Sequence, residues 1–144
     1  MTIQLNGEFT DDRFGDPSQS LYFNNGYATI PADVYFNPIT GGFTIMAWVK
    51  FSSIIDWMSI IDFGLGETDN NIVLAVRNNK MQIDIYSKDN LLPYLLISSV
   101  ESSKPVVIDQ WFHIAVTVSL NSINLYMDGT NYGQYNGSVY FLNY

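Results

Sequence analysis

Residues 109–130 read DQWFHIAVTVSLNSINLYMDGT, and this stretch decides the fold class. From Phe112 to Ser119 apolar and polar side chains alternate, and alternate residues of an extended chain point to the same side. A short polar stretch then leads into a second alternating segment, INLYM, which Asp128 and Gly129 end. The pattern predicts two antiparallel strands folded over one tight turn, each with one buried face.

The same alternation recurs along the chain, in FTIMAWVKF at 43–51 and in MQIDIYS at 81–87. No stretch of about a dozen residues has the 3.6-residue period of an amphipathic helix. Three residue pairs that tolerate the positive φ angles of hairpin turns separate such segments: Asn25 with Gly26, Asn78 with Asn79, and Asp128 with Gly129. The sequence therefore predicts an all-β fold, a two-sheet antiparallel β-sandwich of the jelly-roll type.

Residues 91–105, LLPYLLISSVESSKP, interrupt this alternation with proline and serine. Proline lacks the N–H group that a sheet ladder uses, so it disfavours a central strand. We interpret the segment as a long crossing connection whose leucines are partly tucked under a sheet.

Composition and charge restrict the possible partners. The chain has 144 residues and no cysteine, and its 14 acidic against 6 basic residues give a net charge of −8. Such a charge repels nucleic acid and anionic lipid. No segment approaches the roughly 18 consecutive apolar residues of a spanning helix, and the N-terminus lacks a signal-peptide pattern. We expect one domain over residues 1–144, with no nucleic-acid partner and no membrane insertion.

Several segments together carry a family resemblance. DRFGDPSQSLYFNNGYATIP at 12–31 is followed in order by FTIMAWVKF, SIIDFG, NIVLAVRNNKMQIDIY, WFHIAVTVS and INLYMDG. This series resembles a laminin G-like domain of the concanavalin A-like lectin/glucanase superfamily, whose fold is a jelly roll. The resemblance implies a recognition module of an extracellular or cell-surface protein. It also implies that the family's first and last strands are lacking, because neither is recognisable at residues 1–9 or after Gly129.

Catalysis is not expected from the residues present. A retaining glycosidase needs two carboxyl groups about 5 Å apart, which jelly-roll enzymes place on alternate residues of one strand. The three glutamates, Glu8, Glu67 and Glu101, are isolated from one another in the sequence. His113 is the single histidine, and Ser119 on the same strand face lies about 20 Å away at strand rise. We therefore expect no catalytic residues and predict that the protein is not an enzyme.

A calcium site is one hypothesis for residues 64–71, GLGETDNN. Glu67, Asp69 and Asn70 gather side-chain oxygens of the kind that Ca²⁺ binds, directly before an expected strand. Laminin G-like relatives hold a calcium ion at the rim, and by position the resemblance implies Asp69 as a ligand, with residues 87–89 as a neighbouring loop. The alternative is a solvated turn without a metal.

Carbohydrate binding requires aromatic faces for the apolar side of a sugar ring and polar groups for its hydroxyls. Two groups of residues in expected connections or near the C-terminus offer these: Asp56 and Trp57, and Tyr132, Tyr135 and Asn136. Trp57 is equally compatible with a lid over the core. Trp48 and Trp111 lie inside the matched strands, and we interpret both as core residues.

These observations lead to a first hypothesis and two alternatives. The first is a non-catalytic recognition or adhesion module that binds carbohydrate, with a glycan or glycoprotein as partner. The second is a structural module that binds other protein chains, or itself, through exposed strand edges. A glycosidase is a distant third.

The calcium hypothesis gives a first prediction. Titration calorimetry should show calcium binding to the wild type, no tighter than about 0.1 to 1 mM, which is the weak extracellular range. Asp69→Asn should lose this heat because it removes the one matched carboxylate. Absence of heat from both proteins, or equal heat from both, means that the loop is a solvated turn.

Overall fold

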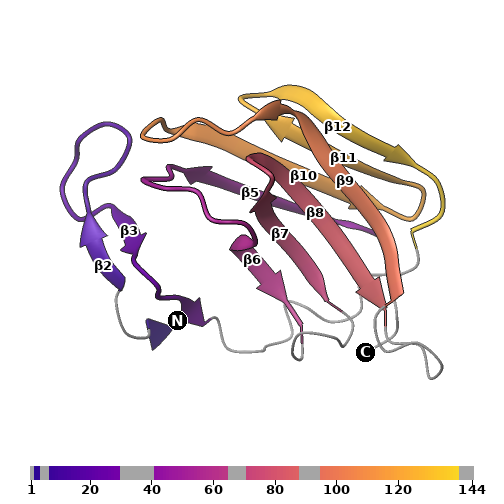
Figure 1. Cartoon of the computed structure of the whole chain (residues 1–144), viewed down its shortest axis with the longest axis horizontal. Helices are drawn as coiled ribbons and strands as arrows, with labels where there is room; N and C mark the ends of the chain where they lie inside the picture. The colour runs from indigo at the N-terminus through magenta and orange to yellow at the C-terminus, as the bar shows by residue number, and fades with distance from the viewer. Residues whose placement is uncertain (1, 4–6, 30–40, 65–70, 88–94, 140–144) are drawn as a thin grey trace. The chain divides into compact units, whose positions relative to one another are not determined.

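The computed structural model describes residues 2–3, 7–29, 41–64, 71–87 and 95–139, and within these ranges the chain forms twelve β-strands and no helix. The chain divides into two compact units, Met1–Asn37 and Pro38–Tyr144 (Figure 1). The all-β prediction is confirmed. The interpretation of residues 1–144 as one domain that lacks the first and last strands of the family stays a prediction.

The first unit contains two small antiparallel sheets. Strand β2 (Gly7–Thr10) pairs with β3 (Ser20–Phe23), and β1 (Thr2–Ile3) pairs with β4 (Ala28–Thr29). The expected hairpin between β3 and β4 is therefore wrong.

The backbone angles explain the error at Asn25 and Gly26. Asn25 has the positive φ, 51°, that a tight turn favours, but Gly26 is absent from the positive-φ residues of the described chain. A type I′ hairpin turn requires positive φ at both central residues. The pair consequently bends the chain from one small sheet into the other.

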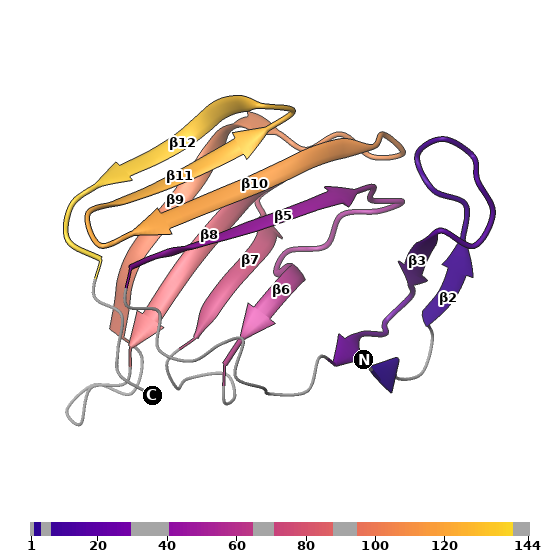
Figure 2. The same cartoon turned by 180° about the vertical axis from the view of Figure 1, so that it is seen from behind.

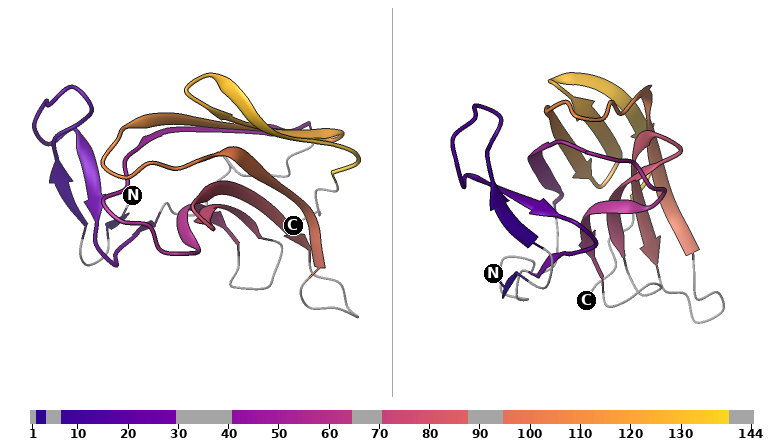
Figure 3. Two further views of the ribbon diagram at one scale, coloured as in Figure 1. Left: turned by 45° about the horizontal axis from the view of Figure 1, so that its top comes forward. Right: turned by 60° about the vertical axis from the view of Figure 1, so that its left-hand side comes forward.

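The second unit is a sandwich of two four-stranded antiparallel sheets. One sheet has the order β12-β11-β10-β5 (Figure 2), and the other has the order β6-β7-β8-β9. The left view of Figure 3 shows the two sheets as separate layers. The strands span Phe43–Val49 (β5), Met58–Phe63 (β6), Ile72–Arg77 (β7), Lys80–Ser87 (β8), Leu95–Pro105 (β9), Phe112–Ser119 (β10), Ser122–Met127 (β11) and Thr130–Asn136 (β12).

The core lies between these two sheets and consists of alternate residues from each strand. The buried positions are occupied by β-branched, other aliphatic and aromatic side chains that suit a pleated surface. They include Phe112, Ile114, Val116 and Val118 of β10, Met81, Ile83 and Ile85 of β8, and Ile72, Leu74 and Val76 of β7. The period-two pattern predicted these inward faces of β8 and β10, and it also placed Ile45 of β5 correctly.

Two of the three predicted hairpin turns are confirmed. Asn78 and Asn79 connect β7 to β8 with φ angles of 48° and 63°, and Asp128 and Gly129 connect β11 to β12 with φ angles of 50° and 78°. Positive φ at both central residues is the signature of the type I′ turn.

The interpretation of residues 91–105 as a crossing connection is wrong. Of this segment, Leu95–Pro105 forms β9, an 11-residue strand that pairs with β8, and Leu96 is exposed. The serines suggested a connection, but one of them stabilises the strand. Buried Ser102 accepts a hydrogen bond from the Met81 N–H (3.1 Å) and donates one to the Lys104 carbonyl (2.7 Å), where the β8–β9 register shifts.

The sheets approach each other closely along β9 and β12. A Cβ atom on Gly133 of β12 would lie 2.7 Å from the carbonyl oxygen of Glu101, so only glycine fits this position. Nearby, the Ser103 hydroxyl donates a hydrogen bond of 2.9 Å to the Tyr132 carbonyl. A direct polar contact thus joins the two layers at this side of the sandwich.

The placement of Trp48 and Trp111 in the core is also wrong. Trp48 is 45% exposed, and Trp111 is half-buried just before β10. The pleat of β5 explains the position of Trp48. Trp48 lies between Ala47 and Val49, which face the core, and must therefore point to the other side.

These burial differences predict the order of stability losses. Ile114→Ala should reduce the free energy of unfolding by about 2 to 5 kcal/mol, because it leaves a cavity in a closed core. Trp48→Ala and His113→Gln should each cost about 1 kcal/mol or less, since their side chains point outwards. Denaturant melts of the three variants test this order. Equal losses for Ile114 and His113 would mean that the faces of β10 are misassigned.

Candidate functional site

The face of the β6–β9 sheet that points away from the core carries a polar cluster. On β8, Gln82, Asp84 and Tyr86 alternate with the core residues, so they share this outer face. In the register of the sheet, Asp84 lies beside Ser99 of β9. Four polar side chains are thus placed together by two adjacent strands.

Asp84 is the centre of this cluster and is 1% exposed. The Gln82 amide nitrogen donates to both of its carboxylate oxygens, at 2.8 and 2.9 Å. The Ser99 hydroxyl donates to Oδ1 at 2.6 Å, and the Tyr86 hydroxyl donates to Oδ2 at 3.2 Å. Three neutral side chains therefore satisfy a buried carboxylate, an arrangement that fixes all four side chains in place.

Tyr86 is held in its protonated form by this environment. Burial raises the pKa of its hydroxyl above 10.0, and the negative charge and the hydrogen bond of Asp84 raise it further, while the positive charge of Arg77 lowers it. A protonated Tyr86 stays a hydrogen-bond donor.

Trp57 stands at the start of β6, next to Arg77. Its backbone has a positive φ of 66°, and its N–H donates a hydrogen bond of 2.8 Å to the Val76 carbonyl. The indole is 46% exposed, and the guanidinium carbon of Arg77 lies 4.7 Å from the ring centroid. This contact is a cation–π interaction, which holds the ring in a defined position.

Asp56 supports the same corner rather than lying open beside Trp57. Its Oδ1 accepts a hydrogen bond of 2.9 Å from the backbone N–H of Asn78, in the turn between β7 and β8. Because Asp56 and Trp57 both bond to this end of the sheet, the chain before β6 is anchored there. Oδ2 of Asp56 is the atom left for a ligand hydroxyl.

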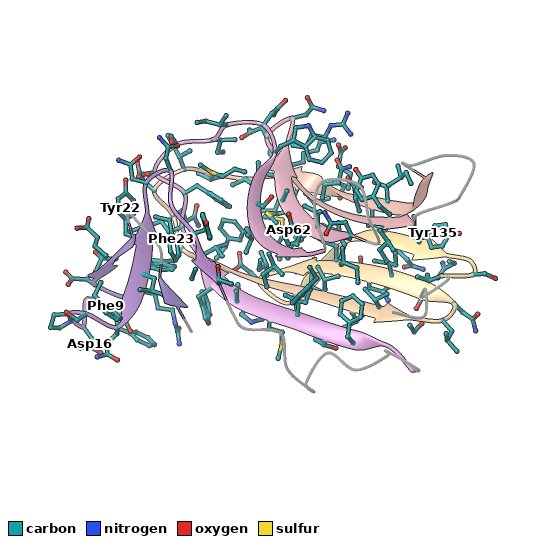
Figure 4. The ribbon with its side chains drawn as sticks, turned by 90° about the horizontal axis from the view of Figure 1, so that it is seen from below. Phe9, Asp16, Tyr22, Phe23, Asp62 and Tyr135 are labelled. Atoms are coloured by element: carbon teal, nitrogen blue, oxygen red, sulfur yellow. The ribbon has the colours of Figure 1, made fainter. Side chains whose placement is uncertain are left out.

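The other predicted group does not join Trp57 in one site. Tyr132 and Tyr135 of β12 are half-buried and pack against the core, and Asn136 is exposed at the end of the strand. The Lys104 ammonium lies 5.3 Å from the Tyr132 ring centroid. Figure 4 shows Tyr135 on β12 and Asp62 on β6, the strand that follows Trp57, on separate sheets. The two predicted groups therefore belong to different parts of the sandwich.

The calcium hypothesis stays a prediction, because Glu67, Asp69 and Asn70 lie outside the described residues. Within the described part of the chain, no three His, Cys, Asp or Glu residues come together as a metal site. The strand-edge hypothesis also stays a prediction. The edge strands of the two four-stranded sheets, within the described residues, are β5, β6, β9 and β12.

Sequence reasoning missed Gln82, Asp84, Tyr86 and Ser99. The alternation in MQIDIYS places the first three on one polar face of the strand. Polar side chains on such a face are normally exposed to solvent, so no buried cluster was predicted there. A signal was present, since Asp and Gln are unusual at alternate positions of a strand so rich in isoleucine. Their burial depends on neighbours distant in sequence, which the pattern of one strand does not contain.

The fold and the sequence agree with one family model. The model of the concanavalin A-like lectin/glucanases superfamily, of laminin G type, matches residues 23–143. The chain belongs to this family. Neither a search of curated proteins nor a search of solved structures found a match.

Membership in this family is typical of a binding module. Laminin G-like domains are generally non-catalytic and often extracellular. No helix in the described ranges is long and apolar enough to cross a membrane. The ligand and the binding residues are therefore inferred from the chemistry of the protein surface.

The Asp84 cluster predicts a pH dependence of stability. Because folding raises the pKa of Tyr86, the folded state holds this proton more tightly, and stability should fall as the pH rises through and above 10.0. Tyr86→Phe should remove this part of the slope. Asp84→Asn should reduce it, since it removes the negative charge and leaves the burial. Denaturant melts between pH 9 and 11 measure the slopes, and identical slopes for wild type and Tyr86→Phe would contradict the assignment.

Proposed function

We propose that this domain is a non-catalytic recognition module that binds carbohydrate at Trp57. The observation that carries this proposal is a half-exposed indole held in place beside Arg77, over a face whose polar groups are already ordered. An ordered aromatic plate loses little conformational entropy on binding. The same site therefore combines an apolar surface with nearby hydrogen-bonding groups.

The chemistry of a neutral sugar fits this combination. The apolar side of a pyranose ring packs on the exposed part of the Trp57 indole. Its hydroxyls can accept hydrogen bonds from the Arg77 guanidinium and donate one to the Asp56 carboxylate. The net charge of −8 disfavours a strongly anionic ligand. Trp57 is accordingly assigned as the stacking residue, with Arg77 and Asp56 as orienting groups.

The biological setting follows from the family and from this ligand. Extracellular and cell-surface proteins meet glycans and glycoproteins, and laminin G-like domains are often extracellular. We place the domain in such a protein, where carbohydrate binding would serve recognition or adhesion.

The proposal predicts a loss of sugar binding in Trp57→Ala. On an array of short oligosaccharides, followed by titration calorimetry with the best ligand, the affinity should fall about tenfold or more, which corresponds to about 1.4 kcal/mol. Trp57→Phe should keep part of the affinity because it retains an aromatic ring. Arg77→Gln should weaken binding to a smaller extent.

Phe9→Ala is the control, because Phe9 is an exposed aromatic side chain of β2, in the other compact unit, and belongs to neither proposed sugar surface. It should leave the affinity for short oligosaccharides unchanged. Thermal melts confirm that each variant is folded. Equal affinity of wild type and Trp57→Ala, or an array without any bound sugar, would refute the assignment.

A further inference from the structure

The outer face of the other sheet, to which β5 and β10 belong, contains a second group of exposed aromatic and apolar side chains. On β5 these are Met46, which is 65% exposed, and Trp48. In the sheet register Trp48 pairs with His113 of β10, and Met46 pairs with Ala115. We call this surface the β5–β10 face. Large apolar side chains gathered on a sheet surface mark an interaction site rather than a chance exposure.

The rings on this face are arranged in successive rows. The Trp48 indole meets the His113 imidazole edge-on, with ring centroids 5.3 Å apart and an interplanar angle of 60°. Just beyond the end of β5, two residues after Trp48, the Lys50 ammonium lies 5.2 Å from the Trp111 ring centroid. Two residues of extended chain span about 7 Å, so the two pairs follow one another along the direction of the strand.

Beyond these rows lies a line of neutral hydrogen-bonding groups. The Asn131 amide donates to the Asn124 Oδ1 (3.2 Å), and the Asn124 amide donates to the Thr117 hydroxyl (3.4 Å). Each amide nitrogen has two hydrogens and uses one of them in this line. The remaining donors are held by a connected network, which prepares them for hydroxyl groups of a ligand.

Charge separates this face from the rest of the molecule. The protein has 14 acidic residues, but the outward side chains of β5, β10 and β11 include none of them. A basic peptide would find no carboxylate to pair with on these strands, and an acidic one would be repelled by the net charge of −8. The Lys50 ammonium adjoins these strands and lies over the Trp111 ring. A ligand that complements the strands themselves is uncharged, with apolar ring faces and many hydroxyls.

We propose that the β5–β10 face is a second binding surface, which takes an extended chain of a neutral polysaccharide. Successive sugar rings pack on Trp111 and Trp48, and their hydroxyls bond to the amides of Asn124 and Asn131. The surface is assembled from adjacent strands of one sheet, so it suits a long chain better than a single sugar. It is independent of the Trp57 site, and either proposal can fail without the other.

The test is co-sedimentation of the whole chain with insoluble cellulose and chitin, and affinity electrophoresis in xylan and galactomannan. The wild type should bind at least one of these polymers. Trp48→Ala should lower the partition coefficient about tenfold or more, Trp48→Phe should lower it less, and Trp57→Ala should keep the Trp48-dependent binding. Thermal melts of every variant check folding.

Three results would overturn the proposal. One is a wild type that none of the four polymers retains, and another is retention by Trp48→Ala equal to that of the wild type. The third is a doubled mass in light scattering that Trp48→Ala abolishes, which would mean that a second copy of the chain covers the face. Loss of oligosaccharide binding in Trp57→Ala with polymer binding intact would support the second surface as a separate site.

Discussion

The two-residue period of the β-strand is the constraint on which the rest of this structure depends. In β10, Phe112, Ile114, Val116 and Val118 are all buried, and each burial of such a side chain contributes about 1.5 to 3 kcal/mol. A shift of one residue would expose all of them at once, so the register is fixed. Every residue between them is then forced outwards, whatever its chemistry, and the outward faces become available for function.

The two sheets use their outward faces differently. On the β6–β9 sheet, Gln82 and Asp84 are buried and are satisfied by hydrogen bonds, and the half-exposed Trp57 stands at one corner of the sheet. On the other sheet, Met46 and Trp48 remain exposed on strands whose outward side chains include no acidic residue. A buried carboxylate without its donors would be costly, which makes the Asp84 cluster a structural support.

The sequence determined the fold class and most inward faces, because alternation and turn chemistry are local. The predictions were wrong where another feature of the sequence was given more weight than the alternation. Trp48 was assigned to the core because it lay in a matched strand. Its position in the alternation, however, places it on the face opposite to Ile45 and Val49. The β9 strand was missed because proline and serine suggested a connection, whereas Ser102 repairs a register shift that only the paired strands create. The burial of Asp84 likewise depends on neighbours far away in sequence.

Two binding surfaces on one sandwich, as the two proposals require, would restrict how a polymer is held. Trp57 and Trp48 belong to different sheets, and the packed core between the sheets fixes their separation. Two sites gain avidity for one chain only if that chain can reach both of them. A stiff polysaccharide cannot bend around the edge of a single sandwich, so it would occupy one surface and leave the other for a second chain. The geometry therefore favours the bridging of separate glycan chains, which is what an adhesion module does.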